Sequence, residues 1–181
     1  MPTYVALLRG VNVGKAKRVP MAELRDVLAG LDCTDASTLL NSGNAVFKSA
    51  ARSPAGCAAM IARALADRFG FDVPVVVKSS RELAAIVAGN PLRFTEADHS
   101  RLLVAFVQDA GQLASLRKIE SLVVSPEQFA IGSDAAYLLC ASGLLASKAG
   151  AALIGAAGRT ATTRNWATVL KLQALALSTS A

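Results

Sequence analysis

The order of short apolar runs and helical patterns repeats along this chain. Residues 4–8 form an apolar run typical of a buried strand, and apolar side chains within residues 21–31 recur at helical spacing. A hairpin pattern and a second helix follow, at residues 39–47 and 54–69. From residue 102 the chain runs through strand, helix, hairpin and helix again. The sequence therefore predicts two halves of similar topology, although they share little residue identity.

One more strand, at residues 73–77, gives the first half a ferredoxin-like order. We therefore expect an α+β fold of two ferredoxin-like βαββα(β) subdomains plus a C-terminal helix from about Asn165 to Ser178. Residues 91–100 contain Pro91, several polar side chains and little periodicity, which favours a linker. The expected organisation is an N-terminal subdomain at 1–90, the linker at 91–100, and a C-terminal subdomain with the final helix at 101–181.

The sequence predicts a protein with a packed core, and we expect it in the cytoplasm. Apolar residues make up 53% of the 181 and charged residues 18%, which argues against disorder. No run approaches the roughly 20 apolar residues that span a bilayer, and Met1-Pro2-Thr3 lacks the basic start of an export signal. The three cysteines lie far apart, as expected of reduced, buried thiols in the cytosol. We expect no contact with a membrane.

Positive charge is concentrated in two segments. The first, residues 9–18, holds four basic side chains and no acidic one. The second begins after Asp134, the last acidic residue, and holds Lys148, Arg159, Arg164 and Lys171. The rest of the chain carries a net negative charge, since the total is only +6. If the two segments meet they form one positive site, and otherwise they are basic loops that keep the protein in solution.

The common catalytic and cofactor motifs are absent. The segment from Gly10 to Lys15 has too few residues between its glycines for a P-loop, and no Ser or Thr follows the lysine. The only histidine, His99, falls in the expected linker, so neither a zinc site nor a catalytic triad can be assembled. The sequence predicts no metal and no cofactor, and it leaves open whether the protein is an enzyme.

Three polar clusters remain at the ends of expected elements. The first, residues 9–14, has two glycines that free its backbone to approach a ligand and an arginine that can grip an anion. The second, residues 41–44, is by itself typical of a hairpin turn. The third, residues 162–166, is expected to open the last helix, where backbone N–H groups attract anions. Trp166 within it is expected in the core.

These clusters also carry a family resemblance. The stretches 4–14 and 19–25, the Asn41-Ser42-Gly43-Asn44 turn with residues 45–47, and residues 162–172 resemble, in order, the motifs of the family called domain of unknown function 1697. Ala167 departs from the pattern, since a polar residue is common there. The resemblance implies two ferredoxin-like subdomains and assigns no activity.

We therefore expect one composite anion site, for a phosphate, nucleotide or carboxylate. Its expected members are amides, hydroxyls, arginines, lysines and loop glycines, namely Arg9, Gly10, Asn12, Gly14, Asn44, Lys148, Thr163, Arg164, Asn165 and Lys171. None of these titrates near neutral pH, so no proton shuttle is expected. The alternatives are a nucleic-acid-binding module, for which Tyr4 and Phe47 would have to stack on bases, and a non-catalytic protein-interaction domain. The oligomeric state is not predicted.

Overall fold

The structure is a computed structural model that describes all residues, 1–181, and it divides into two compact units. Unit 1 comprises Met1–Leu83 and Leu172–Ala181, and unit 2 comprises Ala84–Lys171. Each unit takes a part of helices α3 (Ser80–Ala88) and α5 (Trp166–Ser180). The expected division into subdomains 1–90 and 101–181 with a linker at 91–100 stays a prediction.

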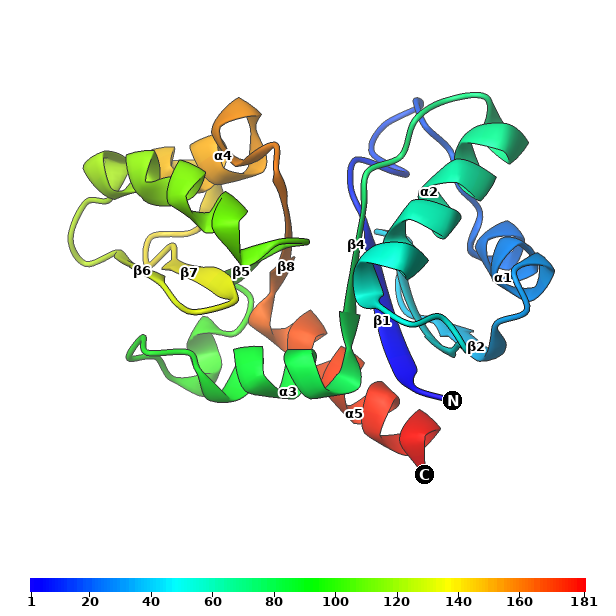
Figure 1. Cartoon of the computed structure of the whole chain (residues 1–181). Coiled ribbons are helices and arrows are strands. Elements are labelled where there is room, and N and C mark those ends of the chain that lie inside the picture. Colours follow the sequence, from blue (N-terminus) through cyan, green and yellow to red (C-terminus); the bar gives the residue numbers. More distant parts are fainter. The chain divides into compact units, whose positions relative to one another are not determined.

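Unit 1 has the ferredoxin-like order. Its sheet has the strand order β2-β3-β1-β4, and every neighbouring pair is antiparallel. The two helices lie on one face of this sheet (Figure 1). The elements in chain order are β1 (Thr3–Leu8), α1 (Met21–Gly30), β2 (Thr34–Thr38), β3 (Asn44–Lys48), α2 (Pro54–Phe69) and β4 (Val75–Ser79).

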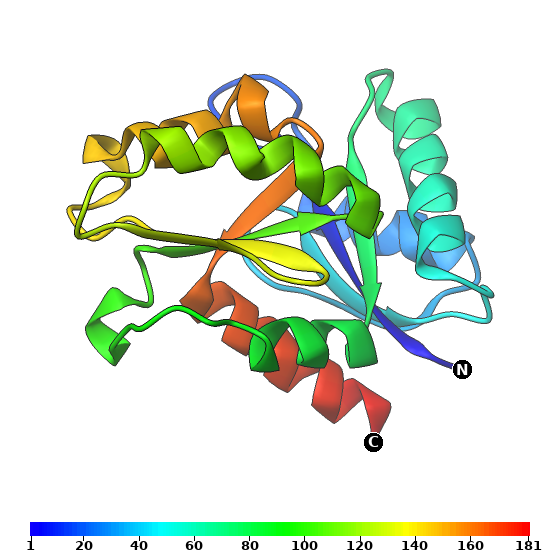
Figure 2. The same cartoon turned by 60° about the vertical axis from the view of Figure 1, so that its left-hand side comes forward.

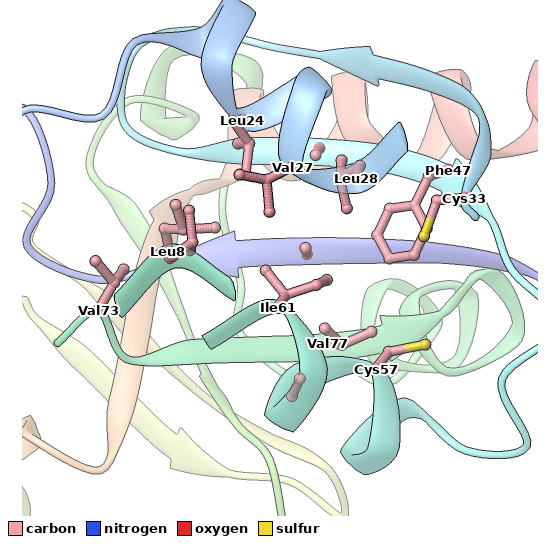
Figure 3. Close-up of a cluster of buried hydrophobic side chains, with 14 of the residues drawn as sticks. Leu8, Leu24, Val27, Leu28, Cys33, Phe47, Cys57, Ile61, Val73 and Val77 are labelled. Carbon is pink, nitrogen blue, oxygen red and sulfur yellow. The ribbon is translucent and has the colours of Figure 1, made fainter. Parts of the chain in front are cut away.

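The core of unit 1 lies between that sheet face and the two helices (Figure 3). Alternate residues of β1 supply one wall, and α1 and α2 supply the other. Helix α2 has clear boundaries, because Ser53 accepts from the Gly56 N–H at its start and Gly70 is left-handed (φ 76°) at its end. The Tyr4 ring packs against Phe47 inside this core, with ring centres 6.0 Å apart.

Unit 2 repeats the order. Its sheet runs β6-β7-β5-β8, again antiparallel throughout, and η2 and α4 lie side by side on one face (Figure 2). The main elements are β5 (Leu102–Val107), the 3-10 helix η2 (Ala110–Leu122), β6 (Gln128–Ile131), β7 (Ala135–Leu139), α4 (Lys148–Ile154) and β8 (Ala161–Asn165). Short 3-10 turns are η1 (Glu96–Asp98), η3 (Leu144–Ala146) and η4 (Ala156–Gly158). The predicted fold class is confirmed.

Two expectations about strands were wrong. The first hairpin begins with Thr34–Thr38, a polar edge strand, whereas Leu39 and Leu40 lie in the turn and Leu40 has a left-handed φ of 58°. Residues 161–165 form β8, whereas the cluster at 162–166 was expected to open the last helix. Both strands carry several polar side chains, so neither shows the apolar run by which the other strands were identified.

None of the helices combines the length and the apolar character that crossing a bilayer requires. The three cysteines are buried and unbridged, as expected.

Candidate functional site

The basic loop of unit 1, residues 9–20, connects β1 to α1 and is fixed at two points. Val11 and Val19 are both buried in the unit 1 core. Between them the backbone turns sharply, with positive φ at Gly10 (69°) and Gly14 (63°), where glycine carries no steric penalty. The side chains of Lys15, Lys17 and Arg18 are exposed on the resulting loop. The sequence folds here into an anchored loop with a basic surface.

Asn12 holds this loop to the β2–β3 turn. Its Nδ2 donates to the Val19 carbonyl at 2.8 Å and to the Asn41 carbonyl at 2.7 Å. Its Oδ1 accepts from the Val19 N–H at 2.9 Å, and its own φ is 57°. Asparagine tolerates this left-handed conformation better than most residues. The structure thus brings the first two polar clusters together, with the Asn12 amide as the connection.

Asn44 stabilises the same turn from inside. Its side chain is fully buried, and its Nδ2 donates to the Leu39 carbonyl at 2.8 Å and to the Ser42 Oγ at 2.9 Å. Gly43 (φ 88°) passes so close to β1 that its carbonyl accepts from the Leu8 N–H at 2.8 Å. Asn44, one of the predicted site residues, therefore stabilises the turn and has no access to solvent.

A pocket of about 230 Å³ lies where the loop, the turn and the start of α1 meet. It is lined by Asn12, Arg18, Val19, Pro20 and Asn41. Pro20 is the N-cap residue of α1, and no side chain caps the first N–H groups of that helix. Arg18 and Asn41 were not predicted as site residues. The signal for Arg18 was present, since it ends the acid-free basic run directly before Val19-Pro20, where the helix begins.

Arg9 lies at the base of the loop, directly after β1. Its backbone N–H donates to the Pro74 carbonyl at 2.9 Å, and its side chain is half-buried. Burial lowers the pKa of its guanidinium from the ordinary value.

The third cluster lies in unit 2 and differs from its expected form. Thr163, Arg164 and Asn165 belong to β8, whose backbone pairs with β5, so their N–H groups do not form a helix start. Asn165 instead caps α5, because its Oδ1 accepts from the Thr168 N–H at 2.9 Å. Arg164 thus lies on β8, whereas Thr168 and Lys171 lie on α5.

Arg164 is the buried cation of this cluster. Its side chain is only 8% exposed, and its guanidinium donates to the Thr162 Oγ1 at 2.9 Å and to the Thr163 carbonyl at 2.8 Å. Burial lowers the pKa of Arg164 to about 10, which still leaves it a cation at neutral pH. The two lysines of unit 2 that were predicted as site residues, Lys148 and Lys171, are exposed.

The predicted site residues are therefore divided between the units. Arg9, Gly10, Asn12, Gly14 and Asn44 belong to unit 1, and the remaining five belong to unit 2. One composite site for all of them stays a prediction. Trp166 is buried as expected, with its ring 5.3 Å from that of Phe94.

The fold and the anchored loop define an α+β protein of two ferredoxin-like units, and comparisons with known proteins place it in a family. The chain belongs to the family described as "Protein of unknown function (DUF1697)", whose model matches residues 1–137. The C-terminal motif at 162–172 lies beyond the matched range. A solved structure, that of the conserved bacterial protein SP0830 from Streptococcus pneumoniae, is similar over 97% of this chain and 98% of its own, with 25% identity and a TM-score of 0.79. No curated protein matches.

Proposed function

We propose that unit 1 binds a small anion, such as a phosphate group, a nucleotide phosphate or a carboxylate, in the pocket beside Arg18. The observation that carries this proposal is the convergence of a cation, amide-bearing loops and a helix start without a side-chain cap on one small pocket. A helix start attracts negative charge, and a guanidinium can hold two anion oxygens at once.

The surrounding charge supports the same ligand class. Residues 9–18 contribute four basic side chains and no acidic one. The acidic residue in the first turn of α1, Glu23, is paired with Arg68 of α2, with 3.7 Å between Oε1 and the guanidinium nitrogen. A charge of one sign in a small hollow raises the local concentration of its counter-ion.

The arrangement suits binding better than proton transfer. The Asn12 amide is already engaged with the backbone, so its role is to hold the loop in shape before a ligand arrives. The pocket lining contains no carboxylate, histidine or cysteine side chain to act as a general acid or base. Any chemistry at this site would therefore rest on electrostatic stabilisation of charge on a bound phosphoryl or acyl group.

Nucleic-acid binding is the second candidate, favoured by the basic sequence and the ferredoxin-like sheets. The aromatic side chains that such a function would use in unit 1 are not on an open sheet surface. Tyr4 and Phe47 are 3% and 0% exposed, and both lie in the core against the helices. Without exposed aromatics the sheet cannot stack bases, which leaves only a salt-sensitive phosphate contact for this function.

The proposal is tested by the thermal stability of the full chain against inorganic phosphate, a nucleoside monophosphate, a sugar phosphate, small carboxylates and a mixed oligonucleotide. At about 100 times its dissociation constant a ligand adds roughly 2.7 kcal/mol to the free energy of unfolding. We expect a small anion to stabilise the wild type and Arg52→Gln, an exposed arginine outside the pocket, but not Arg18→Gln. Arg9→Gln and Arg164→Gln, run beside them, test the composite site.

The outcomes separate the candidates. Stabilisation by the oligonucleotide alone, fading steeply with salt, would favour nucleic-acid binding. Stabilisation by a small anion that Arg18→Gln leaves intact would remove the pocket from the proposal. No stabilisation by any probe would favour the interaction domain. The three buried, unbridged cysteines support a reducing compartment, and we propose the cytoplasm.

A further inference from the structure

Unit 2 contains a second pocket that the anion site does not use. It has a volume of about 240 Å³ and lies between two segments of the unit, residues 122–127 at the end of η2 and residues 142–148 around η3. Its lining is Leu122, Val124, Ser125, Glu127, Ser142, Ala146 and Lys148. The lining thus combines one carboxylate, one ammonium group, two hydroxyls and three aliphatic side chains.

The two charges of this pocket do not neutralise each other. The ion pairs of the protein involve Lys48, Arg68 and Arg101, and none joins Glu127 to Lys148. Glu127 is half-buried and Lys148 is exposed, and both residues line the same pocket, each from its own segment. Opposite charges held apart within one pocket complement a ligand that itself carries both charges.

The carboxylate is held in place by its own segment. The Glu127 Oε2 accepts from the Val124 N–H at 3.1 Å, and the Glu127 N–H donates to the Val124 carbonyl at 2.9 Å. This closed turn fixes the carboxylate beside Ser125 without consuming all of its acceptor capacity. The opposite segment is also ordered, because the Gly143 N–H donates to the Cys140 carbonyl at 2.8 Å and that of Ala146 to the Gly143 carbonyl at 3.3 Å.

The size of the pocket sets the size of the ligand. The volume of the pocket is about 240 Å³. It is smaller than the roughly 300–1,000 Å³ of pockets that hold drug-sized ligands. The aliphatic side chains of Leu122, Val124 and Ala146 provide an apolar wall for a short hydrocarbon group.

We propose that this pocket of unit 2 binds a small zwitterion with an aliphatic side chain, of the size of a free α-amino acid. Glu127 receives the ligand's ammonium group, Lys148 receives its carboxylate, and the hydroxyls of Ser125 and Ser142 complete the polar contacts. The aliphatic wall receives the hydrocarbon group. Because both charged side chains are at least partly exposed, each ionic contact is weak and binding falls in the millimolar range.

The test is a titration of the isotope-labelled full chain with L-leucine, followed by the amide shifts in nuclear magnetic resonance spectra. Two half-charged analogues, 4-methylpentanoate and 3-methylbutylamine, serve as matched ligands. We expect L-leucine to cause saturable shifts confined to residues 122–127 and 142–148, and each analogue to bind roughly two- to fivefold more weakly. Inorganic phosphate should not compete with leucine, since the anion pocket lies in unit 1.

Variants assign the two charges. Glu127→Gln keeps an oxygen that can accept from the Val124 N–H, so the turn is retained while the charge is lost. We expect Glu127→Gln and Lys148→Gln each to weaken leucine binding roughly two- to fivefold, with Glu120→Gln and Lys118→Gln, exposed residues of η2, without effect. Absence of local shifts up to about 50 mM leucine, or analogues that bind as well as leucine, would overturn the proposal.

Discussion

The two units have the same strand order and differ most in the connection from the first strand to the first helix. In unit 1 residues 9–20 lie between β1 and α1, whereas in unit 2 only Gln108 and Asp109 lie between β5 and η2. The short connection of unit 2 is closed by a capping box between Asp109 and Gln112. The long connection of unit 1 ends at an uncapped helix and is held instead by Asn12.

This difference shows what the shared fold does and does not supply. The βαββαβ order places a loop at the same end of both sheets, and the extended loop of unit 1 forms a basic pocket with the neighbouring turn. Ferredoxin-like folds serve many functions, so function is argued from such local additions rather than from strand order. Substitutions at the positions where each unit fixes its own loops test this difference between the units.

The largest expected effect is at Gly43, where the turn of unit 1 meets β1. A methyl group on Gly43 would lie 2.6 Å from the Leu8 Cβ and 2.9 Å from the Val11 Cγ2, and the φ of 88° disfavours any side chain. We expect Gly43→Ala to lower the free energy of unfolding by about 3 kcal/mol or more, from overpacking together with backbone strain. Urea unfolding measures this loss.

Gly10→Ala is the matched control, because its φ is 69° but nothing lies within 4 Å of the added methyl group. Strain alone should cost about 1 kcal/mol there. Equal losses for Gly10→Ala and Gly43→Ala would show that the turn does not pack against β1 as described.

The next-largest expected effect is on the pH dependence of stability, and it comes from the buried tyrosine of each unit. The Tyr137 hydroxyl donates to the Ile86 carbonyl at 2.6 Å, and burial, followed by the nearby Asp134, raises the pKa of Tyr137 from 10.0 to about 12. A raised pKa in the folded state means that folding favours the neutral phenol. Below pH 10 this preference contributes roughly 2–3 kcal/mol to the free energy of unfolding. The contribution is lost as the pH rises to about 12.

The measurement is the free energy of unfolding between pH 9 and 12 for wild type and Tyr137→Phe, since the phenylalanine variant lacks this titration. Tyr4→Phe is the counterpart in unit 1, where the hydroxyl donates to the Ala51 carbonyl at 2.9 Å and burial also raises the pKa. Parallel pH profiles for wild type and Tyr137→Phe would contradict the assignment to Tyr137.

A smaller effect is expected at Asn12. Asn12→Ala removes three hydrogen bonds that connect the loop to Val19 and Asn41 and leaves an alanine at a φ of 57°. We expect a loss of about 2 kcal/mol and faster amide hydrogen exchange within residues 9–20. Asn12→Asp is the informative comparison, because its carboxylate can still accept from the Val19 N–H but cannot donate. If both variants exchange like wild type in the loop, Asn12 does not hold it.

The sequence predicted the fold because apolar periodicity reports packing, and both helix-covered sheet faces follow it. It missed β2 and β8, whose polar side chains resemble loops or helix starts until their partner strands are known. For the site, the basic loop and the Asn41–Asn44 turn were identified from glycine and asparagine chemistry. The burial of Asn44 and the position of Arg18 at the pocket were not predicted, because both depend on how the turn packs against β1 and α1.

The smallest effect tests the short connection of unit 2. The Asp109 Oδ1 accepts from the Gly111 N–H at 3.1 Å, and the Gln112 Oε1 accepts from the Asp109 N–H at 3.1 Å. Asp109→Ala removes the first of these contacts at the start of η2 and should cost about 1 kcal/mol, whereas Asp109→Asn should cost less because it retains an acceptor oxygen. Since Asp109 lies in unit 2 and does not line the proposed anion pocket, neither variant should alter the expected stabilisation of unit 1 by a small anion. A change in that stabilisation would mean that the two connections are not independent, and the contrast between a capped and an anchored loop would no longer explain where the proposed anion site lies.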